Sequence, residues 1–140
     1  MFEGLIEPRV SETDGVGHIN NTFVPVWLEA GRNELFKLFT PDHDFKNWRM
    51  VIVKTTIEYK DQLYFGDFAQ TRCYIKRIGT TSLVLYEEIW QGNRKCVEAE
   101  TIYVNYNQNA KKAEPIPESI RIELEKHYWE EKTDVKEGSV

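Results

Sequence analysis

Four residues near the N-terminus have the types and the spacing for chemistry at a carbonyl carbon. Asp14 precedes His18 by four positions, and Asn20 and Asn21 stand directly before an amphipathic pattern. A carboxylate can attack a carbonyl or activate a water molecule, and the unpartnered first N–H groups of a helix can stabilise the resulting oxyanion. Taken alone, an aspartate in the polar loop 11–17 is more simply an Asx-turn residue, and both asparagines are explained as helix caps.

The residues that follow predict one amphipathic helix of about five turns. Apolar residues recur there at intervals of three and four: Val24, Trp27, Leu28, Gly31, Leu35 and Leu38. Pro25 is compatible with a helix that begins at or just before Asn21, because only the first helical hydrogen bond is then lost. Gly31 on the apolar stripe indicates that another element packs closely against it. Glu29 and Arg32 stand three apart and are expected to form an ion pair.

Period-two alternation accounts for most of the remaining chain. Four segments show it after the helix: 50–59, 69–76, 82–90 and 97–103. One more strand-like segment, 2–10, precedes the helix. We expect the four to follow one another as hairpins, and Pro8 places the first segment at a sheet margin or a bulge. A short helix is predicted from Pro117 onward. The prediction is one α+β domain over residues 1–129 with about five antiparallel strands, and a polar tail over 130–140.

Composition narrows the class of protein. The 140 residues are enough for one domain with its own core, and 18 Lys and Arg against 23 Asp and Glu give a net charge of −5. A negative net charge disfavours general nucleic-acid binding. Because no apolar run reaches the roughly 18 residues of a membrane span, we expect no membrane partner and a cytoplasmic protein.

Metal and redox sites are not indicated by the sequence. Cys73 and Cys96 are too far apart for a C-x-x-C motif and are expected to be buried, reduced thiols. Asp42, His43 and Asp44 form a polar run with no other histidine nearby, which is typical of a turn. We therefore expect neither a metal nor a cofactor.

The run Asp14-x-x-Gly17-His18-x-Asn20-Asn21 resembles the signature of hotdog-fold acyl-CoA thioesterases of the 4-hydroxybenzoyl-CoA thioesterase and YbgC-like class. Further pieces along the chain are similar to the same family: Ile57-x-Tyr59 followed by Gly66-Asp67, Arg77-Ile78-Gly79-x-x-Ser82, and Ile116-Pro117 with Arg121. The resemblance thus extends over nearly the whole chain. It implies a curved antiparallel sheet wrapped around one long central helix, which agrees with the elements predicted above.

The resemblance also implies an activity, the hydrolysis of a coenzyme A thioester to the free acid and coenzyme A. Asp14 would act as nucleophile or general base, the backbone N–H of Asn21 would polarise the carbonyl, and His18 would orient Asp14 or the substrate. A homodimer or homotetramer is implied, with active sites at the interface between protomers. Candidate residues for the acyl group are Gly17, Phe23, Trp27 and Tyr59, and those for the coenzyme A end are Arg77, Thr81 and Ser82.

Alternatives stay open for both the site and the function. The three aromatic candidates are equally explained as core residues. A second branch of hotdog thioesterases carries a catalytic glutamate on the helix, which makes Glu29 the alternative carboxylate. The alternative functions are a binding module that holds an acyl thioester without cleaving it, and a hotdog dehydratase or hydratase. Pro25 and Val24 depart from the usual family pattern, and both lie near the expected mouth of the pocket.

Overall fold

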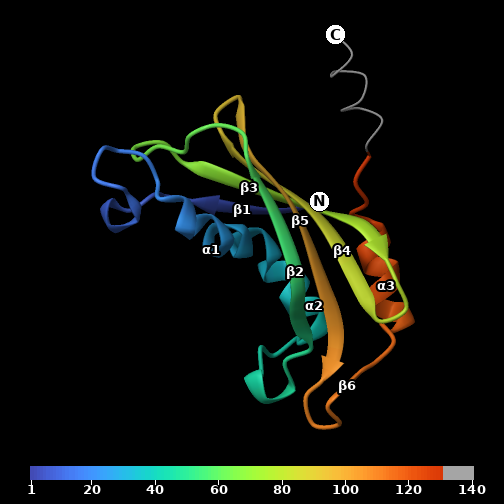
Figure 1. The fold of residues 1–140 in the computed structure, drawn as a ribbon. Helices are drawn as coiled ribbons and strands as arrows, with labels where there is room; N and C mark the ends of the chain where they lie inside the picture. Colours follow the sequence, from blue (N-terminus) through green and yellow to red (C-terminus); the bar gives the residue numbers. More distant parts are fainter. Residues whose placement is uncertain (131–140) are drawn as a thin grey trace.

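The strands build one antiparallel sheet that curves around the helices (Figure 1). In the computed structural model, which describes residues 1–130, the spatial order of the strands is β1-β3-β4-β5-β2. The strands are β1 (Phe2–Ile6), β2 (Met50–Tyr59), β3 (Ala69–Ile78), β4 (Ser82–Gln91), β5 (Arg94–Asn107) and a short β6 (Lys112–Ala113) that pairs with β5. The predicted α+β class and the curved antiparallel sheet are confirmed.

The expected succession of four strands joined as hairpins is wrong for β2. Strands β3, β4 and β5 are antiparallel neighbours in sequence order, but β2 pairs with β5, and β1 pairs with β3. The segment 60–68 therefore leaves β2 at one margin of the sheet and crosses to β3, near the opposite margin, instead of turning back beside β2. Leu63 in this crossing segment is buried in the core, and its carbonyl accepts a 2.8 Å hydrogen bond from the Ile19 N–H. Contacts with the loop before the helix hold the crossing segment in place.

The predicted long helix is present but is not uniform. Helical residues run from Asn21 to Phe39 as a 3₁₀ turn (Asn21–Phe23), α1 (Val24–Leu28), a second 3₁₀ turn (Glu29–Arg32) and α2 (Asn33–Phe39). The Asn20 side chain caps the start by accepting a 2.9 Å hydrogen bond from the Thr22 N–H. A Cβ atom on Gly31 would lie 2.8 Å from Oγ1 of Thr71 in β3. The close packing predicted at Gly31 is therefore confirmed, and its partner is the sheet.

A buried ion pair joins the middle of this helical stretch to β4. Arg32 is only 3% exposed, and its Nε and Nη2 donate to the two carboxylate oxygens of Glu87 at 2.6 and 2.8 Å. Burial lowers the pKa of Arg32, but the hydrogen bonds and charge of Glu87 outweigh burial, so the pKa is raised above its usual value. The expected pair between Arg32 and Glu29 is wrong, because Arg32 points into the core while Glu29 is exposed.

The cysteines and the two ends of the chain largely agree with the sequence-based expectations. Both cysteines are free and buried. Strand β1 lies at a margin of the sheet as predicted, but the predicted strand 2–10 is too long: β1 ends at Ile6, before Pro8, and Val10–Glu12 form a 3₁₀ turn. Helix α3 (Glu118–Glu125) begins directly after Pro117 and buries Leu124. Of the predicted polar tail 130–140, only Glu130 falls within the described residues.

Candidate active site

Asp14 lies in a short loop whose two ends pair with each other. Its N–H donates to the His18 carbonyl at 2.9 Å, and its Oδ1 accepts from the Val16 N–H at 3.1 Å. Gly15 and Gly17 have φ angles of 96° and 89°, which glycine adopts without strain. His18 Nδ1 lies 3.7 Å from Oδ2 of Asp14, and both side chains are 37% exposed. The loop thus presents the Asp14 carboxylate to solvent with the His18 imidazole beside it.

Glu12 holds this loop against the helix. Its buried carboxylate accepts from the Trp27 indole N–H at 3.0 Å and from the Arg9 backbone N–H at 2.8 Å, while its carbonyl accepts from the Asn20 N–H. Burial raises the pKa of Glu12, but the hydrogen bonds from Trp27 and Arg9 outweigh burial and lower the pKa below its usual 4.5. Sequence reasoning missed this role of Glu12. A signal was available, because Trp27 on the apolar stripe needs an acceptor for its indole N–H.

The first N–H groups of the helix differ in whether they have an acceptor. The Thr22 N–H donates to the Asn20 side chain, and the Phe23 N–H donates to the Asn20 carbonyl. The next N–H in the chain donates to the Asn21 carbonyl. Within the described part of the chain, no hydrogen bond uses the Asn21 N–H itself. This N–H is therefore available to a ligand, and it is the group that the family resemblance implies as the oxyanion donor.

A cavity of about 650 Å³ opens beside Asp14 and Asn21. It is bordered by the start of the helix, the end of β2 and the crossing segment. Its wall is apolar at Ile19, Val24, Leu63 and Val97, and polar at Lys60, Asp61 and Gln62. Small-molecule sites commonly have volumes of roughly 300–1,000 Å³ and such a mixture of apolar and polar groups. The structure thus brings Asp14, Asn21 and Tyr59 into the wall of one cavity of ligand size.

Tyr59 links the end of β2 to the start of the helix. Its hydroxyl donates to the Asn21 carbonyl at 3.4 Å. In a regular α-helix, that carbonyl would accept from the N–H of residue 25, but Pro25 has no N–H. The Asn21 carbonyl accepts from the Val24 N–H instead, and with no N–H at position 25 it also accepts from the phenol. This is a structural consequence of the proline that departs from the usual family pattern.

Comparison with known proteins assigns the family. The model of the thioesterase-like superfamily matches residues 8–124 of the chain. The chain belongs to this superfamily. This chain is 54% identical to a predicted thioesterase from Bacillus stearothermophilus. The two structures match with a TM-score of 0.88 over 92% of this chain and 97% of the other. The predicted hotdog thioesterase fold is thereby confirmed, while membership of the YbgC-like class stays a prediction.

Two further relatives match this thioesterase-like chain less well: one has a lower sequence identity, and the other matches over only part of its length. A thioesterase from Thermus thermophilus, solved in complex with coenzyme A and zinc, has a TM-score of 0.78 at 20% identity, over 88% of this chain and 96% of that one. Its likeness shows the fold. YneP from Bacillus subtilis (strain 168), whose name proposes an acyl-CoA thioesterase, is 32% identical over 74 residues. That match spans about half of each protein, 51% of this chain and 54% of YneP.

The other two aromatic candidates of this thioesterase-like chain pack in its core. Trp27 is buried, and Phe23 packs against the same hydrophobic cluster. Neither residue lines the cavity beside Asp14. Glu29, the alternative carboxylate, borders a separate and smaller cavity of about 160 Å³ together with Arg32. The structure therefore groups Asp14 with the helix start and leaves Glu29 further along the helix.

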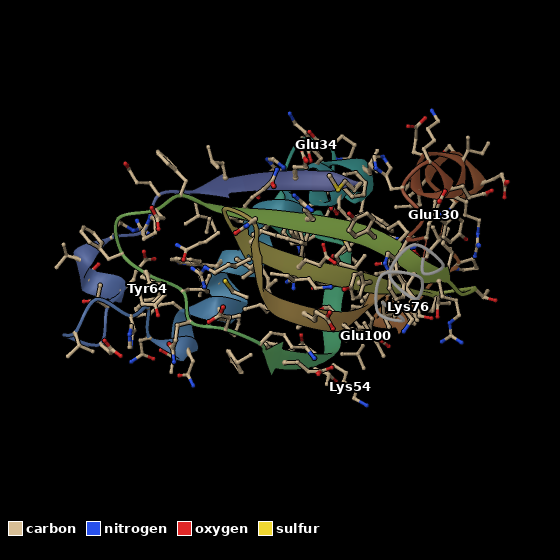
Figure 2. The ribbon with its side chains drawn as sticks, turned by 90° about the horizontal axis from the view of Figure 1, so that it is seen from above. Glu34, Lys54, Tyr64, Lys76, Glu100 and Glu130 are labelled. Atoms are coloured by element: carbon tan, nitrogen blue, oxygen red, sulfur yellow. The ribbon has the colours of Figure 1, made fainter. Side chains whose placement is uncertain are left out.

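The coenzyme A candidates lie at the opposite end of the sheet from the cavity. Arg77 stands near the end of β3, and Thr81 and Ser82 belong to the turn and the first residue of β4. Figure 2 shows Lys76, the neighbour of Arg77, at one end of the sheet and Tyr64, in the crossing segment, at the other. Within one protomer, these three candidates are not brought to the cavity.

The polar part of the cavity wall was missed by sequence reasoning. Lys60 and Asp61 belong to the crossing segment, and the prediction of a hairpin after β2 gave no reason for them to approach the helix. Lys60 Nζ lies 3.0 Å from the Glu58 carboxylate, whose hydrogen bond raises the pKa of Lys60. Asp61 accepts from the Gln62 N–H and pairs with Arg94, and both contacts lower its pKa. The cavity therefore holds a second carboxylate, but one that is already paired.

Among residues 1–130, no group of three or more His, Cys, Asp or Glu side chains is arranged to hold a metal ion. No helix in that range is long and apolar enough to cross a membrane.

Proposed function

We propose that this protein hydrolyses acyl-CoA thioesters, with the reacting carbonyl held between Asp14 and the Asn21 N–H. The observation that carries the proposal is the placement of an unpaired Asn21 N–H and a solvent-accessible Asp14 carboxylate in the wall of one cavity. The name of YneP and the coenzyme A bound by the Thermus thermophilus thioesterase support the choice of substrate.

The chemistry follows from these two groups. The thioester carbonyl oxygen accepts from the Asn21 N–H, which stabilises the negative charge that develops on this oxygen. Asp14 either attacks the carbonyl carbon, forming a mixed anhydride that water then hydrolyses, or removes a proton from a water molecule that attacks instead. In both routes the carbon–sulfur bond breaks and coenzyme A leaves as a thiolate that takes up a proton. The carboxylate of Asp14 is regenerated at the end.

A homodimer is part of the proposal, with the homotetramer as a further assembly of two dimers. Strand β2 is a margin of the sheet, so its outer edge is open to a second copy. Strand β3 runs antiparallel to β2, so Arg77, Thr81 and Ser82 lie at the end of the sheet where β2 begins. In an antiparallel dimer through β2, that end of the partner's sheet lies beside the end of β2 that carries the cavity. The proposed coenzyme A residues would then come from the partner subunit.

The deciding experiment measures thiol release from a panel of short, long and aromatic acyl-CoAs. Asp14→Asn keeps the size of the side chain but removes the charge, so we expect kcat to fall by about 100-fold or more. Asp61→Asn is the matched control, because it removes a carboxylate from the same cavity that is already paired with Arg94. An Asp14→Asn enzyme with undiminished kcat would exclude Asp14 as the catalytic group.

The same panel separates the alternative functions and carboxylates. Glu29→Gln should leave kcat unchanged, and a large loss in this variant would move the catalytic role to Glu29. No thiol release from any acyl-CoA, combined with saturable binding of the same compounds in a calorimeter, would favour the binding module. Light scattering reports the assembly, and a monomer with full activity would contradict a site built from two subunits.

A further inference from the structure

The outer edge of β2 is an exposed apolar strand margin. Strand β2 pairs with β5 on one side and with no strand of residues 1–130 on the other. Val51, Ile52 and Val53 are all exposed along it, Val53 to 61%. Val26 of α1 is also exposed, and it borders the cavity of about 160 Å³ together with Ile52. An unpaired edge rich in β-branched residues is a template for pairing with another strand, and monomeric proteins usually blunt such edges.

The residues of β2 complement a second copy of themselves. Two β2 strands paired antiparallel about Thr56 place Lys54 directly opposite Glu58 of the partner subunit, and the twofold axis repeats the pair. Lys54 makes no ion pair among residues 1–130, and Figure 2 shows it at the free margin of the sheet. A shift of the axis to Ile57 would instead oppose Lys54 to Lys60 of the partner subunit. Charge therefore favours the register about Thr56.

This register brings a loop of one subunit to the cavity of the other. Residues 50–52 of one copy then lie beside residues 60–62 of the partner, which form the polar wall of the partner's cavity. The loop 40–49, which leads into β2, must lie at the same place. In its own subunit, this loop is a whole strand length, about 30 Å, away from residues 60–62.

The loop carries an aromatic cluster on the helix side of the sheet. Phe45 is 77% exposed, and its ring centroid lies 5.5 Å from that of Trp48. Trp48 in turn packs 5.1 Å from Phe36 of α2. The cavity also lies on the helix side, because Val24 of α1 forms part of its wall. The aromatic cluster and the partner's cavity therefore share one face of the joined sheet.

We infer that Phe45, supported by Trp48, covers the acyl group in the cavity of the partner subunit, so that each active site draws Asp14 and Asn21 from one chain and its aromatic cover from the other. This inference rests on the proposed function for the identity of the ligand. It assigns acyl groups larger than acetyl as the preferred substrates, because a short acyl group would not reach the aromatic surface. Phe45 is thus a specificity residue and takes no part in bond breaking.

The first test measures KM for acyl-CoAs of increasing size. Phe45→Ala should raise KM by about 10-fold for large acyl groups, because an apolar contact is lost, and should leave acetyl-CoA unaffected. Leu5→Ala is the control, because Leu5 is also largely exposed, at 70%, but lies on β1, at the opposite margin of the sheet. An unchanged KM for every acyl group in Phe45→Ala would overturn the inference.

The second test asks which subunit supplies Phe45. Asp14→Asn and Phe45→Ala chains are co-expressed with different affinity tags, and the mixed dimer is purified by both tags. One of its two cavities then combines an intact Asp14 with an intact Phe45 from the partner. We expect the wild-type KM at half the wild-type kcat per dimer. A mixed dimer that keeps the raised KM of Phe45→Ala would place Phe45 in its own chain's site and overturn the inference.

A third measurement does not depend on activity. A mixture of Phe45→Cys and Gln62→Cys chains is treated with a short bismaleimide, and the native cysteines do not interfere because both are buried. We expect a covalent dimer in the mixed sample. If the wild-type enzyme releases no thiol but this cross-link forms, the proposed function fails while the arrangement of subunits stands. Absence of the cross-link from a dimeric sample would overturn the arrangement.

Discussion

Replacing Asn21 with proline removes a single hydrogen-bond donor from the proposed oxyanion site. Proline has no N–H and is tolerated at the first position of a helix. The residue before it must be extended, and Asn20 already has φ −62° and ψ 129°. No hydrogen bond of the described residues is lost, because the Asn21 N–H makes none among them. The substitution therefore separates the donor from the structure around it.

The expected size of the effect follows from the neighbouring N–H groups. Those of Thr22 and Phe23 are already occupied by Asn20, so they cannot replace the lost donor without breaking the cap. Loss of one preorganised oxyanion donor typically costs about 100- to 1,000-fold in kcat, or about 2.7–4 kcal/mol. The free energy of unfolding should change by less than about 1 kcal/mol, since proline at a compatible position also restricts the unfolded chain.

The assay compares kcat from thiol release with unfolding in urea followed by far-ultraviolet circular dichroism. Asn21→Ala serves as the control, because it removes the side chain and keeps the N–H, and we expect its kcat to stay close to that of the wild type. The reasoning is refuted if folded Asn21→Pro retains more than about a tenth of the wild-type kcat, since that loss is smaller than one oxyanion donor supplies.

Two predictions concern stability. Glu87→Gln should reduce the free energy of unfolding by about 3–5 kcal/mol, because it leaves the Arg32 charge buried without a counter-charge. The double variant Arg32→Met, Glu87→Leu removes both charges and should unfold at nearly the wild-type urea concentration. Glu12→Gln should flatten the decline of stability in acid. Because the pKa of Glu12 is lowered in the folded state, its contribution to stability is complete above pH 4.5 and is lost as pH falls through the folded-state pKa. Thermal unfolding of both proteins between pH 3 and 6 measures this difference.

The helix and its cap were predictable from sequence because both depend on neighbouring residues. An asparagine cap and an apolar stripe both report on contacts within a few turns. The partner of β2 was not predictable in this way. Which strands pair depends on where the crossing segment packs, and this segment buries Leu63 and contacts the loop that carries Ile19, far from it in the sequence. The polar wall of the cavity, which comes from this segment, was missed for the same reason.

The buried pair of Arg32 and Glu87 was within reach of the sequence. Arg32 stands four positions after Leu28 and therefore lies on the same face of the helix as the apolar stripe, which faces the core. Glu87 lies two residues from both Leu85 and Ile89, so the three side chains share the inward face of their strand. A cation and a carboxylate that each occupy an apolar row can be buried only as partners. Matching such residues between a helix and a strand predicts a long-range contact that periodicity alone does not.

Pro25 connects the chemistry to the assembly of subunits. Pro25 supplies no N–H to the Asn21 carbonyl, which accepts from Val24 and also from Tyr59 at the end of β2. The proposed oxyanion donor is the N–H of this same residue, Asn21. The position of this N–H is thus tied to the strand that is expected to form the dimer. Pairing of β2 with a second copy would restrain Tyr59 and, through it, the start of the helix. A dimer interface on β2 would therefore help to hold the oxyanion donor in place as well as complete the acyl site.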